Sequence, residues 1–210
     1  MIYRVKNSKF LMSYNKIYIF FSSLKEANSL LFQSKFKFIK KDNYYSYKEK
    51  IELYISGIGK NNTLNFIKNL NLENNSIIFK VGTCGILNNI EILKPFIPSF
   101  VFHQDKKIYI NKDILKNIED KILVHNKGLL TVLNPISSLE EKQIILEQGF
   151  SLVDMETFFI MDNFNNIPTI PILVGTDRGD CNSKIDFIKN INQASVILKD
   201  CIEKIIHPLF

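Results

Sequence analysis

The chain has 210 residues, of which 46% are hydrophobic and 23% are charged, and this composition excludes a disordered or fibrous protein. A chain of this length buries enough apolar surface to fold as one domain without disulfides. The formal net charge of +6 comes almost entirely from lysine, since only Arg4 and Arg178 are arginines. Proteins that read nucleic acids depend on arginine for bidentate contacts, so we expect no nucleic-acid partner.

The sequence shows no signal for a membrane or an oxidising compartment. The longest uninterrupted apolar run near the start is Ile17–Phe21, which is too short for a membrane span. No small-residue cleavage site follows it, as a secretory signal would require. The three cysteines, Cys84, Cys181 and Cys201, are odd in number and widely spaced. We expect a cytoplasmic protein with reduced cysteines and no membrane contact.

In the first half of the chain, an irregular extension over residues 1–15 is followed by alternating strands and helices. Aromatic and β-branched residues predict strands at 16–21, 51–55 and 76–81, and a strand pair within 36–47. Ser23 and Glu26 form a capping-box signature, which predicts a helix to about residue 32. A second helix follows Gly59, with an apolar face formed by Leu64, Ile67 and Leu70.

The second half continues this alternation. The pattern predicts short strands between residues 95 and 132 with one helix at 112–119, and a helix at 139–148 that Gly149 terminates. A strand at 151–153 then leads into a helix at 155–164, and a buried strand at 170–174 precedes a last helix at 184–206, ended by Pro208. Several strands are continuously apolar, which favours an α/β fold with a largely parallel sheet. No linker divides the chain, so we expect a single domain over 1–210.

Common signatures of nucleotide binding, metal binding and serine hydrolysis are incomplete or missing from the sequence. The glycines at 57 and 59 follow a predicted strand, but Asn62 stands where a dinucleotide fingerprint has its third glycine. A phosphate-binding loop fails as well, because Asn61 follows the lysine. We interpret the segment as a tight strand-to-helix turn. No Gly-x-Ser-x-Gly elbow occurs. Three histidines lack the spacing of metal ligands: His103, His125 and His207.

Three groups of polar residues stand at the ends of predicted strands, where open α/β sheets bind their ligands. The first begins with Gly82 and Thr83, which offer close backbone approach and a hydroxyl. The second places Asp154 and Glu156 at a strand-to-helix turn, and in the third Asp177 follows an apolar strand. Each alone has a structural explanation, such as Asp154 capping a helix. Their common order and spacing point to a functional site.

Four segments carry a family resemblance. They are Ser-Gly-Ile-Gly-Lys at 56–60, Val-Gly-Thr-Cys-Gly at 81–85, Val-Asp-Met-Glu at 153–156 and Val-Gly-Thr-Asp at 174–177. Together they resemble the nucleoside phosphorylase/nucleosidase superfamily, in particular the branch of 5′-methylthioadenosine/S-adenosylhomocysteine nucleosidases. The resemblance runs from about Lys16 to Asp180, and its specific part is the Met-Glu pair with the later Thr-Asp. It implies a three-layer α/β/α fold around a twisted, mostly parallel mixed sheet, and a homodimer or higher homo-oligomer.

The resemblance implies cleavage of the N-glycosidic bond of a purine nucleoside, a small-molecule substrate. Breaking this bond leaves positive charge on the ribose and negative charge on the base. An acid beside the base makes it a better leaving group, and a carboxylate below the sugar stabilises the cation. By resemblance, Asp177 is the acid, Glu156 binds both ribose hydroxyls and Met155 packs against the sugar. The resemblance implies no metal and no organic cofactor.

Two reactions are compatible with the resemblance. The hydrolytic branch activates water with a Glu near the first strand, which Glu26 matches, and an Arg four residues before the acid, where this chain has Leu173. The phosphorolytic branch binds phosphate through Arg side chains and a hydroxyl. This chain offers Lys80 and Thr83, with Lys25 as a second cation. We favour hydrolysis of a 5′-modified adenosine; the alternative is phosphorolysis, with phosphate as co-substrate.

A third hypothesis is a relative that binds a nucleoside without turning it over. The segment Leu133–Ser138 stands where the family supplies an aromatic residue that stacks on the base, and it contains no aromatic side chain. The presence of both Asp177 and Glu156 favours an enzyme, because a protein that only binds has no need of the acid.

Overall fold

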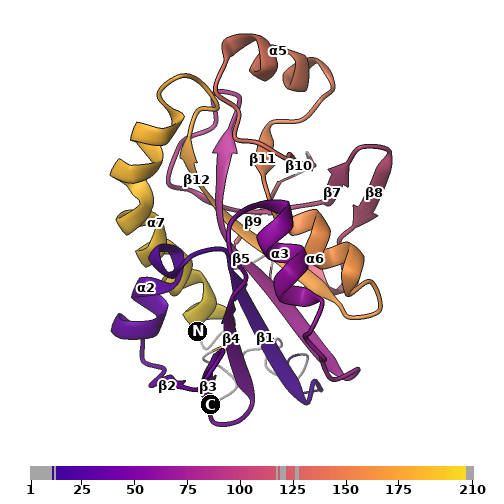
Figure 1. The fold of residues 1–210 in the computed structure, drawn as a ribbon, viewed down its shortest axis with the longest axis vertical. Helices are drawn as coiled ribbons and strands as arrows, with labels where there is room; N and C mark the ends of the chain where they lie inside the picture. The colour runs from indigo at the N-terminus through magenta and orange to yellow at the C-terminus, as the bar shows by residue number, and fades with distance from the viewer. Residues whose placement is uncertain (1–10, 12, 117, 119–121, 126–127, 207–210) are drawn as a thin grey trace, which may run out of the picture.

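A mixed β-sheet forms the centre of the computed structural model, which describes residues 11, 13–116, 118, 122–125 and 128–206 (Figure 1). Twelve strands make up the sheet within these residues. They are β1 (Lys16–Phe21), β2 (Ile39–Lys40), β3 (Tyr45–Tyr47), β4 (Ile51–Ile55), β5 (Ser76–Ile86), β6 (Pro95–Pro98), β7 (Phe100–His103), β8 (Lys106–Tyr109), β9 (Leu123–His125), β10 (Leu129–Thr131), β11 (Leu152–Asp154) and β12 (Thr169–Asp177).

The long strand β5 is the branch point of this sheet. One path runs β2-β3-β4-β1-β5-β11-β10-β7-β8, while β12 pairs with the other edge of β5 and leads to β6 and β9. Six of the eleven strand pairings in the described residues are parallel, and these include β1 with β4, β1 with β5, and β12 with β5. The expectation of a mostly parallel mixed sheet is therefore confirmed.

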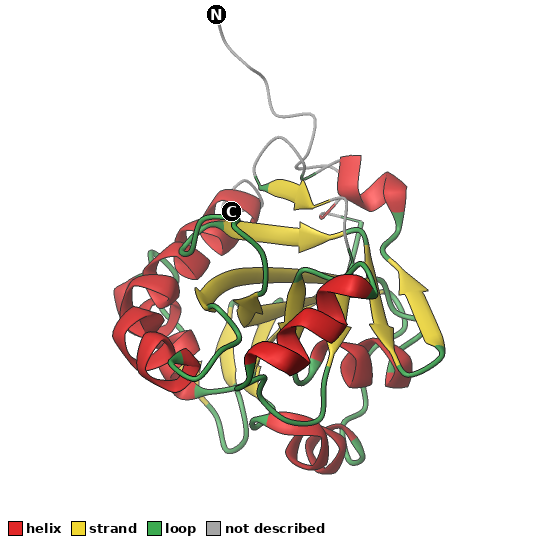
Figure 2. Cartoon of the chain, turned by 90° about the horizontal axis from the view of Figure 1, so that it is seen from above, coloured by secondary structure: helices red, strands yellow, loops and turns green. Residues whose placement is uncertain are grey.

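Helices cover both faces of the sheet. The described helices are α2 (Leu24–Gln33), α3 (Gly59–Ile67), α4 (Lys112–Lys116), α5 (Leu139–Glu147), α6 (Thr157–Asn163) and α7 (Ser183–Ile206). Helices α2 and α7 pack together on one side, where α7 lies against β12 and β5, and α3 packs against α6 on the other side. Figure 2 shows the strands between the two groups of helices, so the three-layer α/β/α arrangement is confirmed.

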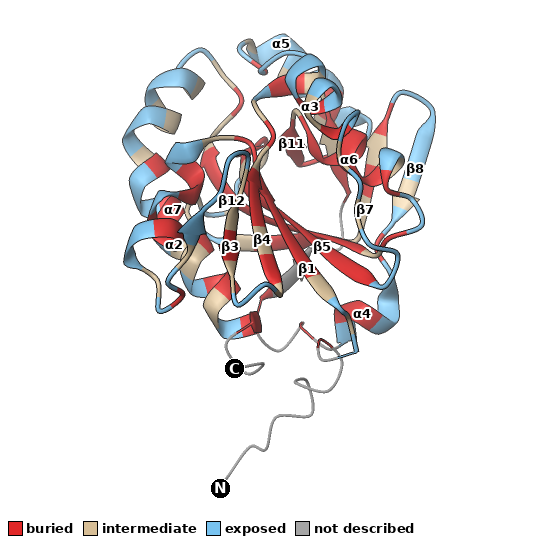
Figure 3. Cartoon of the chain, turned by 60° about the horizontal axis from the view of Figure 1, so that its bottom comes forward, coloured by how far each residue is buried: buried red, intermediate tan, exposed pale blue. Residues whose placement is uncertain are grey.

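The continuously apolar strands are explained by burial on both faces (Figure 3). In β1, Ile17, Ile19 and Phe21 face the core beneath α2 and α7, whereas Tyr18 and Phe20 face the core beneath α3 and α6. All five side chains are buried. A strand covered in this way has no polar face to show, so its sequence lacks the alternation of a half-exposed strand.

Several predicted elements have the bounds expected from the sequence. Strands β1 and β4 occupy 16–21 and 51–55, and the segment 36–47 contains the strand pair β2 and β3. The capping box at the start of α2 is present: the Ser23 hydroxyl accepts from the Glu26 backbone, and Oε2 of Glu26 accepts from the Ser23 backbone at 2.9 Å. Helix α5 ends before Gly149, which has a φ of 89°.

Two strands are longer than predicted. The sequence predicts strands that end at residues 81 and 174, yet β5 continues to Ile86 and β12 to Asp177. The cause is their parallel pairing with each other, which extends from Thr169 beside Ile78 to Asp177 beside Gly85. Glycine-rich segments that looked like turns are therefore strand ends held in the sheet.

Two helices differ from prediction as well. Helix α6 begins at Thr157 instead of residue 155, with Glu156 as its N-cap residue, and the Asp154 carboxylate accepts the backbone N–H of Thr157 at 2.9 Å. In α3, Leu64 is 37% exposed, and Leu70 lies beyond the last helical residue. Of the three residues predicted to form the apolar face, Ile67 both belongs to the helix and is buried.

Some predictions fall outside the described residues. They are most of the extension at 1–15, the end of the helix at 112–119, and His207 with Pro208. None of the helices in the described part of the chain is long and apolar enough to cross a membrane. The three cysteines are free thiols, as predicted, and only Cys181 is exposed.

Candidate active site

A cavity of about 250 Å³ lies at the carboxyl ends of β1, β5 and β12 and gathers residues from distant parts of the chain. Of the residues given a catalytic or substrate-binding role from the sequence, those that line it are Glu26, Thr83, Met155, Glu156 and Asp177. Lys80 and Gly82 do not line the cavity. They lie behind its wall on β5, where Lys80 contacts Glu156 and Gly82 lies against Glu26.

Glu26 is fixed in place by four hydrogen bonds. Its Oε1 accepts from the backbone N–H and the hydroxyl of Thr83, both at 2.8 Å. Its Oε2 accepts from the backbone N–H of Ser23 at 2.9 Å and from the Ser23 hydroxyl at 3.1 Å. A carboxylate has about four acceptor positions, so these donors saturate it. The first turn of α2 and the end of β5 thus hold one anion between them.

Glu156 lies on the turn between β11 and α6, and it is 5% exposed. Its Oε1 accepts the backbone N–H of Gly59 at 2.7 Å, and its Oε2 accepts the Ser22 hydroxyl at 2.9 Å. Gly59 has a φ of 81°, so the glycine turn at 57–59 is a backbone device that points an N–H at this carboxylate. The ammonium of Lys80 is 3.8 Å from the same Oε2.

Burial raises the pKa of Glu156 from its usual 4.5 to about 7. The nearby Lys80 ammonium and the Gly59 N–H lower this pKa, whereas the negative charges of Asp154 and Glu26 raise it. Desolvation is the largest of these effects. The carboxyl group is therefore near the midpoint of its titration at neutral pH, and small changes in surrounding charge alter its protonation.

Asp177 is the last residue of β12, and it also lines the cavity. Burial raises the pKa of its carboxyl group above the usual value, while hydrogen bonds from Gly179, Ser183 and Thr176 act in the other direction. The Gly179 N–H donates to Oδ1 at 3.1 Å, and the Thr176 hydroxyl donates to Oδ2 at 3.1 Å. No ion pair of Asp177 is recorded among the described residues. The environment thus favours a proton on this group.

Two neighbours of Glu156 have different tasks. Asp154 accepts from the Thr131 hydroxyl at 2.7 Å and from the backbone and hydroxyl of Thr157, so its carboxylate caps α6 and joins it to β10. Met155 lines the cavity, and its Cε lies 3.6 Å from where a Cβ on Gly59 would be. The methionine thus presents a flexible apolar surface beside the glutamate.

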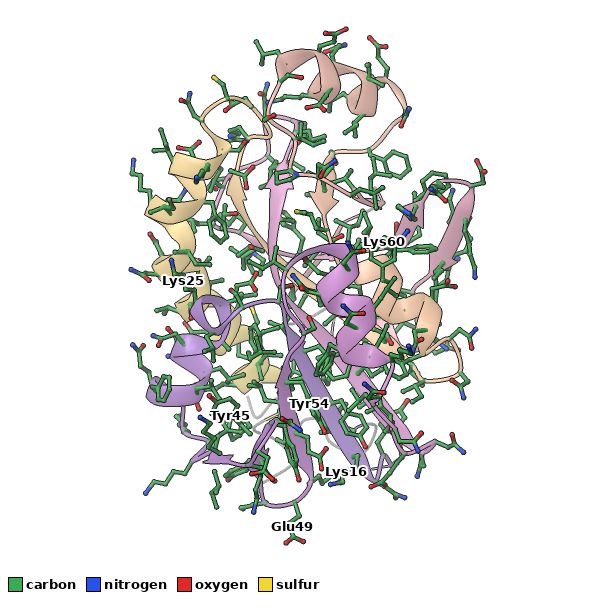
Figure 4. All side chains as sticks on the ribbon, in the orientation of Figure 1. Lys16, Lys25, Tyr45, Glu49, Tyr54 and Lys60 are labelled. Carbon is green, nitrogen blue, oxygen red and sulfur yellow. The ribbon has the colours of Figure 1, made fainter. Side chains whose placement is uncertain are left out.

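The departures from the family pattern have definite places in the structure. Leu173 is fully buried in β12 and pairs with Gly82 of β5. Lys25 is exposed on α2 and does not line the cavity, which excludes it from an anion site there (Figure 4). From the segment 133–138, Pro135 and Ile136 reach the wall of the cavity. This part of the wall is aliphatic.

Several lining residues were not predicted from the sequence. Ser22 follows β1, Cys84 belongs to β5, and Phe187 with Lys184 comes from the first turns of α7. Phe187 adds an aromatic ring to the cavity that no local motif announces. The only signal is its position in the first turns of the helix that follows β12, because ligands of open α/β sheets bind outside the carboxyl ends of the strands. Burial keeps the Cys84 thiol neutral by raising its pKa.

Within the described residues, no group of three or more His, Cys, Asp or Glu side chains is arranged to hold a metal ion. The acidic residues of the cavity are instead tied to hydroxyls, backbone N–H groups and one lysine. The site can therefore place two or three carboxyl groups of different protonation around a small molecule.

Comparison with known proteins finds solved structures with a similar fold. No protein-family model and no curated sequence matches the chain. In structure, it is similar to a futalosine hydrolase mutant of Helicobacter pylori (16% identity, 92% of this chain and 99% of that chain, TM-score 0.77). It is also similar to 5′-methylthioadenosine/S-adenosylhomocysteine nucleosidase (MTAN) of Chlamydia trachomatis bound to MTA (19%, 93% and 99%, TM-score 0.78).

The same nucleosidase of Streptococcus pneumoniae, with a transition-state inhibitor, is 15% identical over 93% of this chain and 100% of that chain, with a TM-score of 0.79. Each similarity covers nearly the whole length of this chain and of the chain it is compared with. They establish that the described chain has the fold of the nucleosidases, as the four sequence segments implied.

Proposed function

We propose that the protein is an enzyme that hydrolyses the N-glycosidic bond of a purine nucleoside, and that this nucleoside is a 5′-modified adenosine. The observation that carries the proposal is a pair of carboxyl groups that line one cavity, the buried Glu156 and the half-buried Asp177, both with a raised pKa. Each has a raised pKa, but only Glu156 has a cationic partner recorded among the described residues. Two such groups suit an acid and an anion in one reaction.

Asp177 is proposed as the acid. With a raised pKa it retains its proton more readily near neutral pH, and it can donate that proton or a hydrogen bond to N7 of the purine as the bond breaks. Neutralising the negative charge that develops on the base lowers the barrier to its departure. The Gly179 N–H and Thr176 hydroxyl hold the carboxyl group in one orientation, so little reorganisation is needed.

Glu156 is proposed to bind the ribose. A carboxylate accepts hydrogen bonds from both sugar hydroxyls, and its negative charge stabilises the oxocarbenium-like transition state. Met155 then packs against the sugar beside it. Since Gly59 and Ser22 already orient the carboxylate, the substrate meets an acceptor that is fixed before binding.

Hydrolysis is favoured over phosphorolysis by the contacts of Glu26. A phosphate ion on β5 would use the backbone N–H and hydroxyl of Thr83, but the Glu26 carboxylate already accepts from both. The ammonium of Lys80 is likewise used by Ser22 and Glu156. Phosphate would therefore have to displace one carboxylate and lie beside another, which like-charge repulsion opposes. We propose that Glu26 orients the attacking water, with the Ser23 and Thr83 hydroxyls rotating to admit it.

The rest of the cavity wall supports a substrate with an apolar 5′ group. Its lining includes Ile58, Val132, Pro135, Ile136 and Phe187, and apolar surface predominates. The similar nucleosidase structure from Chlamydia trachomatis is bound to MTA, and a further similar structure, an MTAN mutant of Helicobacter pylori, has 5′-methylthioadenosine in its active site. A thioether substituent would match such a wall by its size and polarisability.

A product assay tests the proposal. Purified protein is offered methylthioadenosine, S-adenosylhomocysteine, adenosine, inosine and uridine, each with and without phosphate and with EDTA present, because we expect no metal requirement. We expect free adenine and free sugar without phosphate, identified by mass. Sugar 1-phosphate formed only with phosphate would instead establish a phosphorylase. Absence of turnover combined with a nucleoside-induced thermal shift would refute the catalytic role and indicate a binding protein.

A further inference from the structure

A lysine is buried directly behind the wall of the cavity. Lys80, on β5, is 1% exposed, and its Nζ donates to the Ser22 hydroxyl at 2.8 Å. The same hydroxyl donates to Oε2 of Glu156 at 2.9 Å, and Nζ lies 3.8 Å from that oxygen. Taking an ammonium out of water is costly unless a charge and hydrogen bonds replace the water. A lysine in this place therefore needs the glutamate as its partner.

The described residues around Lys80 leave room for its ammonium and supply no other positive charge: Gly82 has no side chain, and Leu173 is apolar. A Cβ on Gly82 would lie 2.8 Å from Nζ of Lys80 and 3.0 Å from Oε1 of Glu26, so a side chain there would intrude between the two charges. Leu173, beside Gly82 on β12, is apolar. Among the described residues, the contact with Lys80 is the one recorded ion pair of Glu26 or Glu156. The buried ammonium of Lys80 is thus the recorded positive charge beside the carboxylates of Glu26 and Glu156.

We propose that Lys80 is a positioning residue of this site: its ammonium, directly and through the Ser22 hydroxyl, keeps the Glu156 carboxylate charged and oriented to accept the ribose hydroxyls. Which substrate group the carboxylate binds rests on the proposed function. The coupling between Lys80 and Glu156 rests on their contacts alone, so the two ideas can fail separately.

The charges around Glu156 make this role necessary. Burial alone drives the carboxyl group toward its neutral form, and Asp154 and Glu26 add repulsion in the same direction. Lys80 is the charged group that opposes them, helped by the neutral donor at Gly59. Its removal should therefore raise the pKa of Glu156 further above 7, and the ribose would meet a protonated group that accepts fewer hydrogen bonds.

The titration of Glu156 tests the coupling without any substrate. Carboxyl ¹³C signals of glutamate-labelled protein are followed against pH, and Glu156→Gln identifies the resonance. We expect Lys80→Met to raise the apparent pKa by about one unit or more, Lys80→Arg to restore it, and Ser22→Ala to move it less in the same direction. The matched control is Lys16→Met, which removes a 2.6 Å ion pair with Glu52 at the opposite end of β1.

An unchanged titration in folded Lys80→Met would overturn the proposal, and so would an equal shift in Lys16→Met. If Lys80→Met does not fold, Ser22→Ala and Lys80→Arg decide the matter, because both retain a cation. A Ser22→Ala titration equal to wild type would then count against the coupling.

Kinetics connect the coupling to the reaction. For wild type, ionisation of Glu156 should contribute a rise of kcat/KM with pH through about 7. A one-unit shift in Lys80→Met leaves about a tenth of the groups ionised at pH 7 instead of half, so kcat/KM falls about fivefold relative to wild type there. The ratio of variant to wild type returns toward one near pH 9, because ionisation of the acid Asp177 lowers both alike. A uniform loss at all pH values would contradict the proposal. Phosphate-dependent turnover lost in Lys80→Met would instead make Lys80 an anion ligand.

Discussion

Replacing Asp177 with Asn removes the proposed acid while changing few contacts. The amide oxygen can still accept the Gly179 N–H, which lies at 3.1 Å in the wild type. The amide N–H can donate to the Thr176 hydroxyl, since a hydroxyl both donates and accepts. The proton that neutralises the leaving base is lost. Asp177→Asn should therefore separate catalysis from folding.

The size of both effects follows from the site. General acid catalysis contributes about 10²–10⁴-fold, which corresponds to roughly 2.7–5.4 kcal/mol in the barrier. Because the hydrogen bonds of Asp177 with Gly179 and Thr176 survive, the free energy of unfolding should change by less than about 1 kcal/mol. Any change at neutral pH should be an increase, because burial penalises the ionised form of Asp177 and the neutral amide escapes that penalty.

The assay compares initial rates of adenine release by wild type, Asp177→Asn and the control Asp180→Asn. Asp180 is a nearby loop carboxylate that accepts from the Asn182 backbone at 2.9 Å and does not line the cavity. We expect kcat to fall at least a hundredfold in Asp177→Asn and less than twofold in the control. Urea unfolding checks stability. A folded Asp177→Asn protein with near-wild-type kcat would refute the assignment of the acid.

Three further predictions follow from the same contacts. Glu156→Gln should lower kcat/KM about a hundredfold. It should also flatten the pH dependence of stability, measured with urea at several pH values. The folded-state pKa of about 7 exceeds the usual 4.5, so wild type loses on the order of 3 kcal/mol of unfolding free energy as pH rises from about 4.5 to 7. An identical pH dependence in Glu156→Gln would contradict this. Thr83→Val, which lacks the hydroxyl bonded to Glu26, should lower kcat/KM about tenfold, whereas Thr83→Ser should not; equal rates would count against an oriented Glu26. Gly82→Ala places a Cβ 2.8 Å from Nζ of Lys80, and we expect about a hundredfold loss of kcat/KM with an unchanged circular dichroism spectrum.

Local rules accounted for most elements because the sequence and the tertiary structure require the same thing there. The capping box at Ser23 and Glu26 starts α2, and Gly149 ends α5. The rules failed where a non-local pairing decides the outcome. The glycine-rich ends of β5 and β12 look like turns locally, yet the register of Asp177 with Gly85 holds them in the sheet. No window of single-sequence pattern contains that pairing.

The same division applies to the site. Asp177, Glu156 and Glu26 could be named from motifs, because each lies at a strand end or helix start with a recognisable neighbour. The partners that set their chemistry could not. Ser22 looks like one of two serines before a helix, but its hydroxyl bonds to Lys80, 58 positions away, and to Glu156, 134 positions away. Such a contact depends on which strands are adjacent, and it follows only from the sheet order.

Burial acts on the two central carboxyl groups in the same direction, although the proposed reaction needs them in opposite states. Asp177 must keep a proton to assist the base, and its described partners are neutral donors that oppose burial only in part. Glu156 must lose its proton to bind the sugar, and it differs by having an ammonium 3.8 Å away. Position 173 on β12 is the apolar Leu173, so the positive charge beside Glu156 comes from Lys80 on the adjacent strand β5. The Lys80 ammonium, which is recorded beside Glu156 and not beside Asp177, is the feature by which a single cavity can favour the anion at one carboxyl group and the acid at the other.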